Sequence, residues 1–137
     1  MARDIFHYNF KSALEKEGWI VTDDPFRVSY EDIEYSIDLA AERLMIAEKG
    51  EEKIAVEIKT FGQQSIINAF HEAIGQFINY RIALRLTNPE RVLYLAVPDH
   101  AYKRFLSKPF GIELIEQEHL KIIVFDPLDK KIVQWIK

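Results

Sequence analysis

The most constraining feature of this sequence is the apolar run at residues 91–97, RVLYLAV, in which polar residues do not alternate with apolar ones. Neighbouring side chains of a β-strand point to opposite faces of a sheet, so this run predicts a strand that is covered on both faces. Covering both faces of a sheet requires helices on each side of it. We therefore expect an α/β fold with a mixed central sheet flanked by helices. At a length of 137 residues we expect one domain over residues 1–137.

Helical periodicity predicts the helices that flank this sheet. Residues 4–17 carry apolar side chains at helical spacing, and Gly18 is expected to end that helix. A longer helix is expected from Ser65, as its N-cap, to about residue 86. Shorter helices are expected after Pro98 and within residues 108–120. The buried face expected for the long helix consists of Ile67, Phe70, Ile74, Phe77, Ile78 and Leu84.

Alternation of apolar and polar residues predicts the other strands. In residues 53–60 the isoleucines and the valine at even positions share one face, and Glu57 and Lys59 share the other. A polar turn at residues 49–52 makes this segment the second arm of a hairpin. The expected strands are residues 19–21, 26–30, 33–37, 43–48, 53–60, 122–125 and 132–136.

Composition excludes several classes of protein. The chain has no cysteine, which rules out disulfide frameworks, thiolate zinc sites and cysteine nucleophiles. Its formal net charge of −4 argues against a polybasic nucleic-acid coat and leaves room only for a local basic groove. No apolar run reaches membrane-spanning length, and the first ten residues, MARDIFHYNF, lack the pattern of a secretory signal. We therefore expect a soluble cytoplasmic protein without a membrane partner.

Asp38, Glu57 and Lys59 form the constellation with the most chemical content. Glu57 and Lys59 are two positions apart on an expected strand, so their side chains emerge from one face, and Asp38 ends an earlier strand that is expected to lie beside it. Carboxylate oxygens suit Mg²⁺ or Mn²⁺, so Asp38 and Glu57 are the expected metal ligands, with the carbonyl of Ile58 as a further oxygen. Lys59 would then orient or deprotonate an attacking water. The alternative is a solvated strand face with Asp38 in a turn, and the spacing alone favours neither.

Longer blocks of sequence resemble known families. The order of the expected elements, with Glu57-Ile58-Lys59 on a strand before a long helix, resembles the PD-(D/E)XK nuclease superfamily, whose restriction-endonuclease-like fold has the core order αβββαβ. The blocks ARDIFHYNFKSALEKEGWIVTDDP, IDLAAERLMIAEKGEEKIAVEIKTF, FHEAIGQFINYRIAL and RVLYLAVPDHAY resemble the XisH family, the fdxN-element excision controlling factors of cyanobacteria. This resemblance covers essentially the whole chain. It implies a role in programmed DNA excision during heterocyst differentiation, with DNA and an XisI-like companion protein as partners.

The superfamily resemblance also implies roles for individual residues. Asp38, Glu57 and Lys59 match its metal-binding and catalytic positions. Gln76 and Tyr80, in the segment GQFINY, match a glutamine-then-tyrosine motif on the long helix, where the glutamine lies near the metal site. For Tyr80 the sequence slightly favours the alternative of a core aromatic residue.

The sequence departs from the superfamily pattern at two places. Ile37 stands where the motif has proline. Many relatives have a glutamate on the first helix that faces the site, and no residue here falls clearly at that position. Glu42, four residues after Asp38, is an additional candidate for a metal ligand. The polar residues of the first helix are Asp4, His7, Asn9, Glu15 and Glu17.

Three hypotheses for function follow. The first is a Mg²⁺- or Mn²⁺-dependent DNA endonuclease that uses Asp38, Glu57, Lys59 and Gln76. The second is a non-catalytic accessory protein that directs a separate recombinase through protein or DNA binding. The third is a regulator that acts through a partner or a homodimer, with the sheet edges and Trp135 as its surface. Basic residues available for phosphate contacts are Arg81, Arg85, Lys103, Arg104 and Lys108, although an ordinary charged helix face is favoured for each one.

Overall fold

Within residues 2–23, 44–61 and 65–137, which are those that the computed structural model describes, six strands form one mixed sheet in the order β1-β2-β3-β4-β5-β6. Asp38 and Glu42 lie outside these residues, as do the strands expected at 26–30 and 33–37. Strands β3, β4 and β5 are parallel, and the other neighbouring pairs are antiparallel. The strands are β1 (Ile20–Asp23), β2 (Leu44–Lys49), β3 (Glu52–Ile58), β4 (Val92–Pro98), β5 (Ile122–Asp126) and β6 (Lys131–Ile136).

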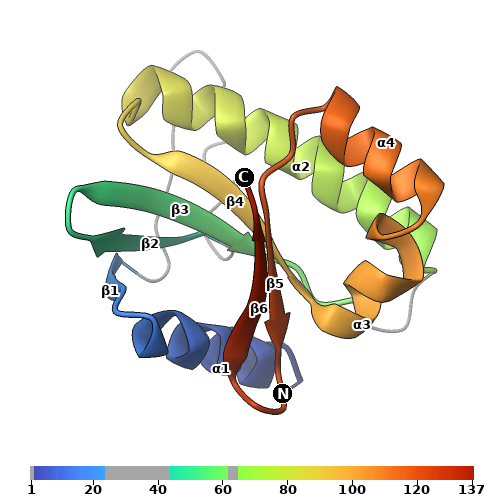
Figure 1. Cartoon of the computed structure of the whole chain (residues 1–137). Helices are drawn as coiled ribbons and strands as arrows, with labels where there is room; N and C mark the ends of the chain where they lie inside the picture. Colours follow the sequence, from blue (N-terminus) through green and yellow to red (C-terminus); the bar gives the residue numbers. More distant parts are fainter. Residues whose placement is uncertain (1, 24–43, 62–64) are drawn as a thin grey trace.

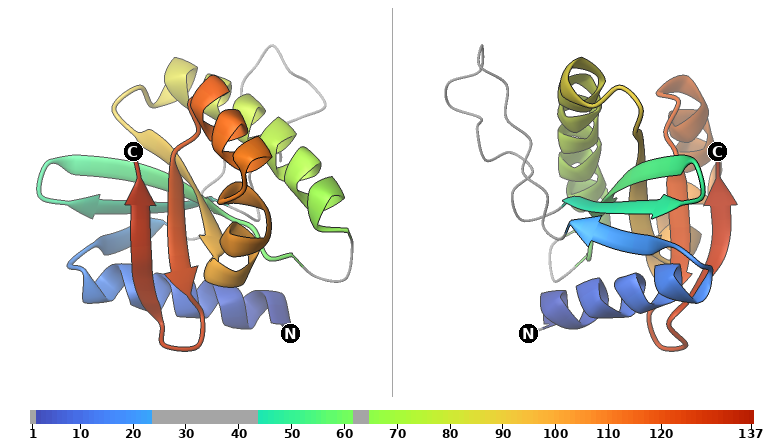
Figure 2. Two further views of the ribbon diagram at one scale, coloured as in Figure 1. Left: turned by 45° about the vertical axis from the view of Figure 1, so that its right-hand side comes forward. Right: turned by 90° about the vertical axis from the view of Figure 1, so that its left-hand side faces the viewer.

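Helices cover both faces of this sheet (Figure 1). Helix α1 packs on one face, and α2 and α4 lie on the other, which the turned views also show (Figure 2). No helix in the described part of the chain is both long and apolar enough to cross a membrane. The helices are α1 (Ala2–Lys16), α2 (Ile66–Thr87), α3 (Asp99–Ala101), the π-helical turn η1 (Tyr102–Leu106) and α4 (Pro109–Gln117).

Two separate apolar cores show that β4 is buried on both faces. Leu93 and Leu95 belong to the core beneath α2, whereas Tyr94 and Ala96 belong to the core beneath α1. Strand β3 divides its side chains in the same way, because Ile54, Val56 and Ile58 pack towards α1 and Ala55 packs towards α2. The predictions of a doubly covered strand at 91–97 and of alternating faces at 53–60 are therefore confirmed.

Glycines end α1 and close the β2–β3 hairpin, as the sequence predicted. Gly18 (φ +93°) and Gly50 (φ +62°) adopt the left-handed backbone that glycine tolerates best. Ser65 stands at the N-cap position of α2, but its hydroxyl makes no capping hydrogen bond, so only the position of this cap was predicted correctly. Its carbonyl oxygen accepts the N–H of Ala69, as the first turn of a helix requires.

The helix expected after Pro98 is present, but it changes character along its length. It begins as α3 and continues as the π-helical turn η1, from which the chain enters α4 at Pro109. A π-helical turn widens the helix by one residue per turn. Gly111 of α4 packs directly on the backbone of Phe105 and Leu106 in η1, which brings α4 close to the end of this turn.

Candidate functional site

Glu57 is the next-to-last residue of β3, where the sheet holds it between Leu44 on β2 and Leu95 on β4. Its side chain is fully buried, and both carboxylate oxygens are removed from solvent. It points to the face that α2 covers, because it alternates with the residues that pack towards α1. The alternative of a solvated strand face is therefore wrong for Glu57.

Lys59 follows directly after β3 and lies on the same face as Glu57. Its backbone N–H donates a hydrogen bond to the carbonyl of Ala96 at 3.0 Å, so the parallel pairing with β4 continues one step past the strand. Its side chain is also buried, and the ammonium lies 3.1 Å from a carboxylate oxygen of Glu72 on α2. The sheet and α2 together fix the position of this ammonium.

Helix α2 presents Glu72, Gln76 and Tyr80 at successive four-residue intervals, which places them along one side of the helix. Gln76 is half-buried, and Tyr80 is almost completely buried in the core beneath α2. The alternative of a core aromatic residue therefore fits Tyr80. Glu72 was not predicted from the sequence, although its spacing from Gln76 was the signal that would have identified it.

Several other candidates have structural roles away from Glu57. Helix α1 packs on the opposite face of the sheet, and Glu17 at its end accepts a hydrogen bond from the indole N–H of Trp135 at 3.1 Å. Arg81 donates to the carbonyls of Glu118 and His119 at 2.9 and 3.2 Å, which satisfies the end of α4. For Arg81 a structural role therefore fits better than a phosphate contact.

Among the described residues, no three His, Asp or Glu side chains gather closely enough to hold a metal ion. The oxygen donors that β3 supplies here are the carboxylate of Glu57 and the backbone carbonyl of Ile58, both of the type that Mg²⁺ accepts. A second carboxylate at this place would have to come from outside the described residues, and Asp38 is the residue that the sequence puts forward.

Comparison with known proteins decides the family. The family model described as XisH protein matches residues 1–133. The chain belongs to the XisH family. No similarity to a curated protein reaches significance.

Two solved structures agree with this assignment to the XisH family. An XisH family protein from Nostoc punctiforme PCC 73102 is 46% identical, with a TM-score of 0.87, over 98% of this chain and 100% of the other. A fdxN element excision controlling factor protein from Anabaena variabilis is 45% identical, with a TM-score of 0.88, over 98% of this chain and 99% of the other. The similarity to both proteins extends over nearly the full length of the XisH-family chain.

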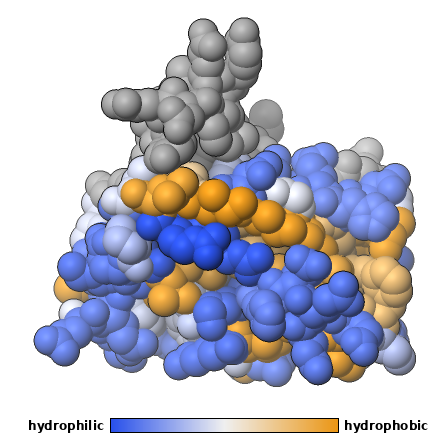
Figure 3. Space-filling view, turned by 90° about the horizontal axis from the view of Figure 1, so that it is seen from above, coloured by the Kyte–Doolittle hydropathy of each residue, from blue (hydrophilic) through white to orange (hydrophobic). Residues whose placement is uncertain are grey.

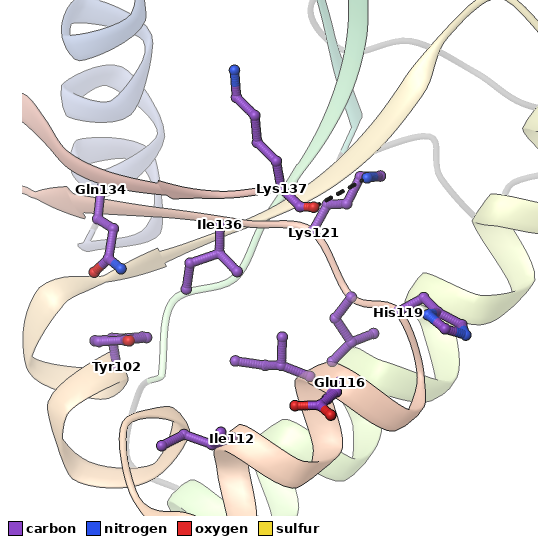
Figure 4. A pocket seen from close by; sticks show the side chains of 10 residues that line it. Tyr102, Ile112, Glu116, His119, Lys121, Gln134, Ile136 and Lys137 are labelled. Carbon is purple, nitrogen blue, oxygen red and sulfur yellow. Dashed lines mark hydrogen bonds between the residues drawn. The ribbon is translucent and has the colours of Figure 1, made fainter.

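A cavity of about 530 Å³ in this XisH-family chain lies between η1, α4 and the hairpin of β5 and β6. Figure 4 shows Gln134 and Ile136 pointing from β6 into this cavity, while the side chain of Lys137 points away from it. Of the predicted site residues that the structure describes, none lines the cavity. The cavity is therefore separate from Glu57 and Lys59.

The surface seen from above Figure 1 is of mixed character (Figure 3). An apolar band runs across it beside a strongly hydrophilic patch. The exposed large apolar residues of the two helices on this side of the sheet include Ile82 and Leu86 on α2 and Phe110 and Ile112 on α4. Apolar side chains at this exposure are more typical of protein contacts than of contacts with a phosphate backbone.

Proposed function

We propose that this XisH-family chain acts in the programmed excision of a DNA element as a metal-dependent endonuclease with a restriction-endonuclease-like fold. The observation that carries the proposal is the burial of Glu57 and Lys59 on one face of β3, beneath α2. The element order α1, β1, β2, β3, α2, β4 supports the fold assignment, because it agrees with the core order αβββαβ of that superfamily.

The burial of these two ionisable groups has a physical cost that favours a functional reason for them. Removing a carboxylate and an ammonium from water costs several kcal/mol for each ion before their contacts are counted. Two apolar side chains of similar volume would often stabilise the fold equally or more. Buried ionisable groups at the end of a strand are therefore candidates for chemistry, and Glu57 and Lys59 are the buried charged residues within the described part of the chain.

In the proposed site, Asp38 and Glu57 hold Mg²⁺ or Mn²⁺ with the carbonyl of Ile58. When bound, such an ion lowers the pKa of its water and offsets the charge that develops on the phosphate. Lys59 orients the attacking water towards the phosphorus, and its contact with Glu72 fixes the ammonium in place. Gln76, one turn further along α2, hydrogen-bonds the same water or the scissile phosphate.

Metal-dependent nicking of supercoiled, linear and branched DNA tests the endonuclease proposal. We expect cleavage with Mg²⁺ or Mn²⁺, and its loss in Lys59→Ala and Asp38→Ala. Lys53→Ala is the matched control, because Lys53 is an exposed lysine at the other end of β3. Folding of each variant is checked by thermal unfolding. If the wild-type protein cleaves none of these DNAs with either ion, the endonuclease proposal is wrong.

The second candidate function is a non-catalytic accessory that directs a separate recombinase. The exposed apolar residues Ile82 and Leu86 on α2 favour it, because they offer a surface for another protein. Calorimetry separates the two functions, since an accessory protein is expected to give the same heat with Mn²⁺ as its Glu57→Ala variant. Co-purification with an XisI-like companion and light scattering test the proposed protein partner and a homodimer.

A further inference from the structure

A second, smaller cavity of about 140 Å³ lies on the α1 side of the sheet. It is lined by three aromatic residues, Trp19, Tyr94 and Trp135, and by charged residues described below. Helix α1 ends at Lys16, and the hairpin of β2 and β3 reaches past this end of the helix (Figure 1). The cavity lies near the start of β3 and Glu57 near its end on the opposite face, so the two sites are independent.

The three rings form two walls at nearly right angles. The ring of Trp19 stacks on that of Trp135 with centroids 5.7 Å apart and an angle of 30° between their planes. The ring of Tyr94 meets Trp135 edge-on, with centroids 5.2 Å apart and planes at 89°. Aromatic faces carry negative charge density, and the ring of Trp135 is the one in this pocket over which an ammonium lies.

Charged side chains complete the lining of this aromatic pocket. Glu17 and Glu52 contribute carboxylates, and Glu17 also accepts the hydrogen bond of the Trp135 indole at 3.1 Å. Lys49 and Lys137 contribute ammonium groups, and that of Lys137 lies 5.8 Å from the centre of the Trp135 ring. The pocket therefore already has one cation of its own chain resting over an aromatic ring.

The side chain of Tyr94 adds a hydroxyl group to the lining of this pocket. Tyr94 is only 6% exposed. Burial first, and then the nearby carboxylate of Glu52, raise the pKa of Tyr94, so a negative charge on this hydroxyl is disfavoured.

We propose that this pocket binds a guanidinium or alkylammonium group, which displaces the ammonium of Lys137 from Trp135. The rings supply the cation–π surface, the carboxylates of Glu17 and Glu52 balance the charge, and the Tyr94 hydroxyl accepts an N–H. The volume suits a head group of side-chain size. Such a group comes either from a free amine or from an arginine of a protein partner, and the chemistry of recognition is the same for both.

Tryptophan fluorescence is a direct assay of this site, because both tryptophans of the chain line the pocket. We expect a saturable change in emission with agmatine and with a short arginine peptide. The matched peptide with citrulline in place of arginine, which is neutral, is expected to cause no such change. Tighter binding of the arginine peptide than of agmatine identifies a protein as the source, and equal or tighter binding of agmatine identifies a free amine.

Two substitutions at exposed positions give opposite expected effects on affinity. Lys137→Met removes the competing cation and is expected to tighten agmatine binding roughly two- to fivefold, the range that a cation–π contact of about 0.5–1 kcal/mol implies. Glu52→Gln removes an attracting carboxylate and is expected to weaken binding. Lys130→Met is the control, since the ammonium of Lys130 lies over Tyr8 and outside the pocket. The proposal is overturned if the citrulline peptide acts like the arginine peptide, or if Lys137→Met weakens binding.

Discussion

The ammonium of Lys59 lies 3.1 Å from a carboxylate oxygen of Glu72 and thereby joins the end of β3 to the second turn of α2. The Lys59 side chain is 10% exposed, whereas that of Glu72 is 55% exposed, so the ion pair crosses from the interior to the surface. Glu72 therefore orients a buried ammonium without being buried itself. In the proposed endonuclease, Lys59 orients the attacking water, and Glu72 positions Lys59.

Glu72→Gln is expected to lower stability moderately and DNA cleavage more strongly. Solvent reaches the Glu72 end of the ion pair, and glutamine keeps an oxygen that can accept from the buried ammonium, so we expect a loss of about 1–2 kcal/mol in the free energy of unfolding. Loss of the orienting carboxylate leaves the Lys59 ammonium free to change rotamer, so we expect slower metal-dependent DNA cleavage and a shifted pH profile. The measurements are nicking rates over pH and thermal unfolding. Glu113→Gln, on the exposed side of α4, is the control, and equal cleavage by both variants would contradict this role.

Arg81→Met is expected to loosen the end of α4. Its guanidinium donates to the carbonyls of Glu118 and His119, beyond the last turn of that helix. Because the site is only partly buried, we expect a loss of about 1–2 kcal/mol in the free energy of unfolding, as measured by urea denaturation. Arg85→Met, one turn later on α2 and exposed, is the control and is expected to change the free energy much less.

Gly111→Ala and Gly75→Ala are expected to change stability in opposite directions. A Cβ at Gly111 would overlap the carbonyl oxygen of Phe105 and the backbone of Leu106, so α4 must move away from η1 at a cost of about 1–3 kcal/mol. A Cβ at Gly75 meets no atom within 4 Å, and alanine in mid-helix is expected to add roughly 0.5–1 kcal/mol. Paired thermal melts test this, and equal effects at both glycines would refute the close packing at Gly111.

Asp126 is expected to make the β5–β6 turn sensitive to acid. Its carboxylate accepts the N–H groups of Asp129 and Leu128 at 3.1 and 2.9 Å. The hydrogen bond from Asp129 is the main reason why the pKa of Asp126 lies below its ordinary value of 3.8. Because the folded pKa is below the unfolded one, this stabilisation is complete above the ordinary value and is lost as pH falls through the folded pKa.

The pH dependence of Asp126→Asn tests this turn. We expect the variant to be less stable than the wild-type protein at neutral pH and to approach it as the pH falls into the acid range. Unfolding free energies from urea titrations at several pH values give the comparison. Glu90→Gln, at an exposed position before β4, is the control. A constant difference between Asp126→Asn and the wild-type protein across the acid range would exclude the carboxylate as the cause.

Local patterns in the sequence predicted most of the described elements. The alternation around Ile54, Val56 and Ile58 fixed which side chains of β3 face α1, because the two-residue period of a strand is set by backbone geometry. The uninterrupted run before Pro98 indicated a strand with two cores for the same reason. The resemblance to the XisH family, carried by long blocks, is confirmed over residues 1–133.

Contacts between distant segments were not predictable in this way. Glu48 on β2 forms an ion pair with Arg91 at 2.9 Å, and no pattern within either segment indicates this pairing. Glu72 lies one turn before Gln76, and this spacing indicates that the two share one side of the helix, but it does not indicate that Glu72 would pair with Lys59. Spacing along one element says which residues share a face, and it does not say which residue of another element lies opposite.

The sequence alone determined the family, the α/β class and the pairing of Glu57 with Lys59 on one strand face, because periodicity and long sequence blocks are local properties of the chain. Only the tertiary structure decided that both residues are buried beneath α2, that Glu72 holds Lys59, and that Trp19, Tyr94 and Trp135 line one cavity. Burial and partnership depend on how distant elements pack against one another, and packing is a property of the whole fold.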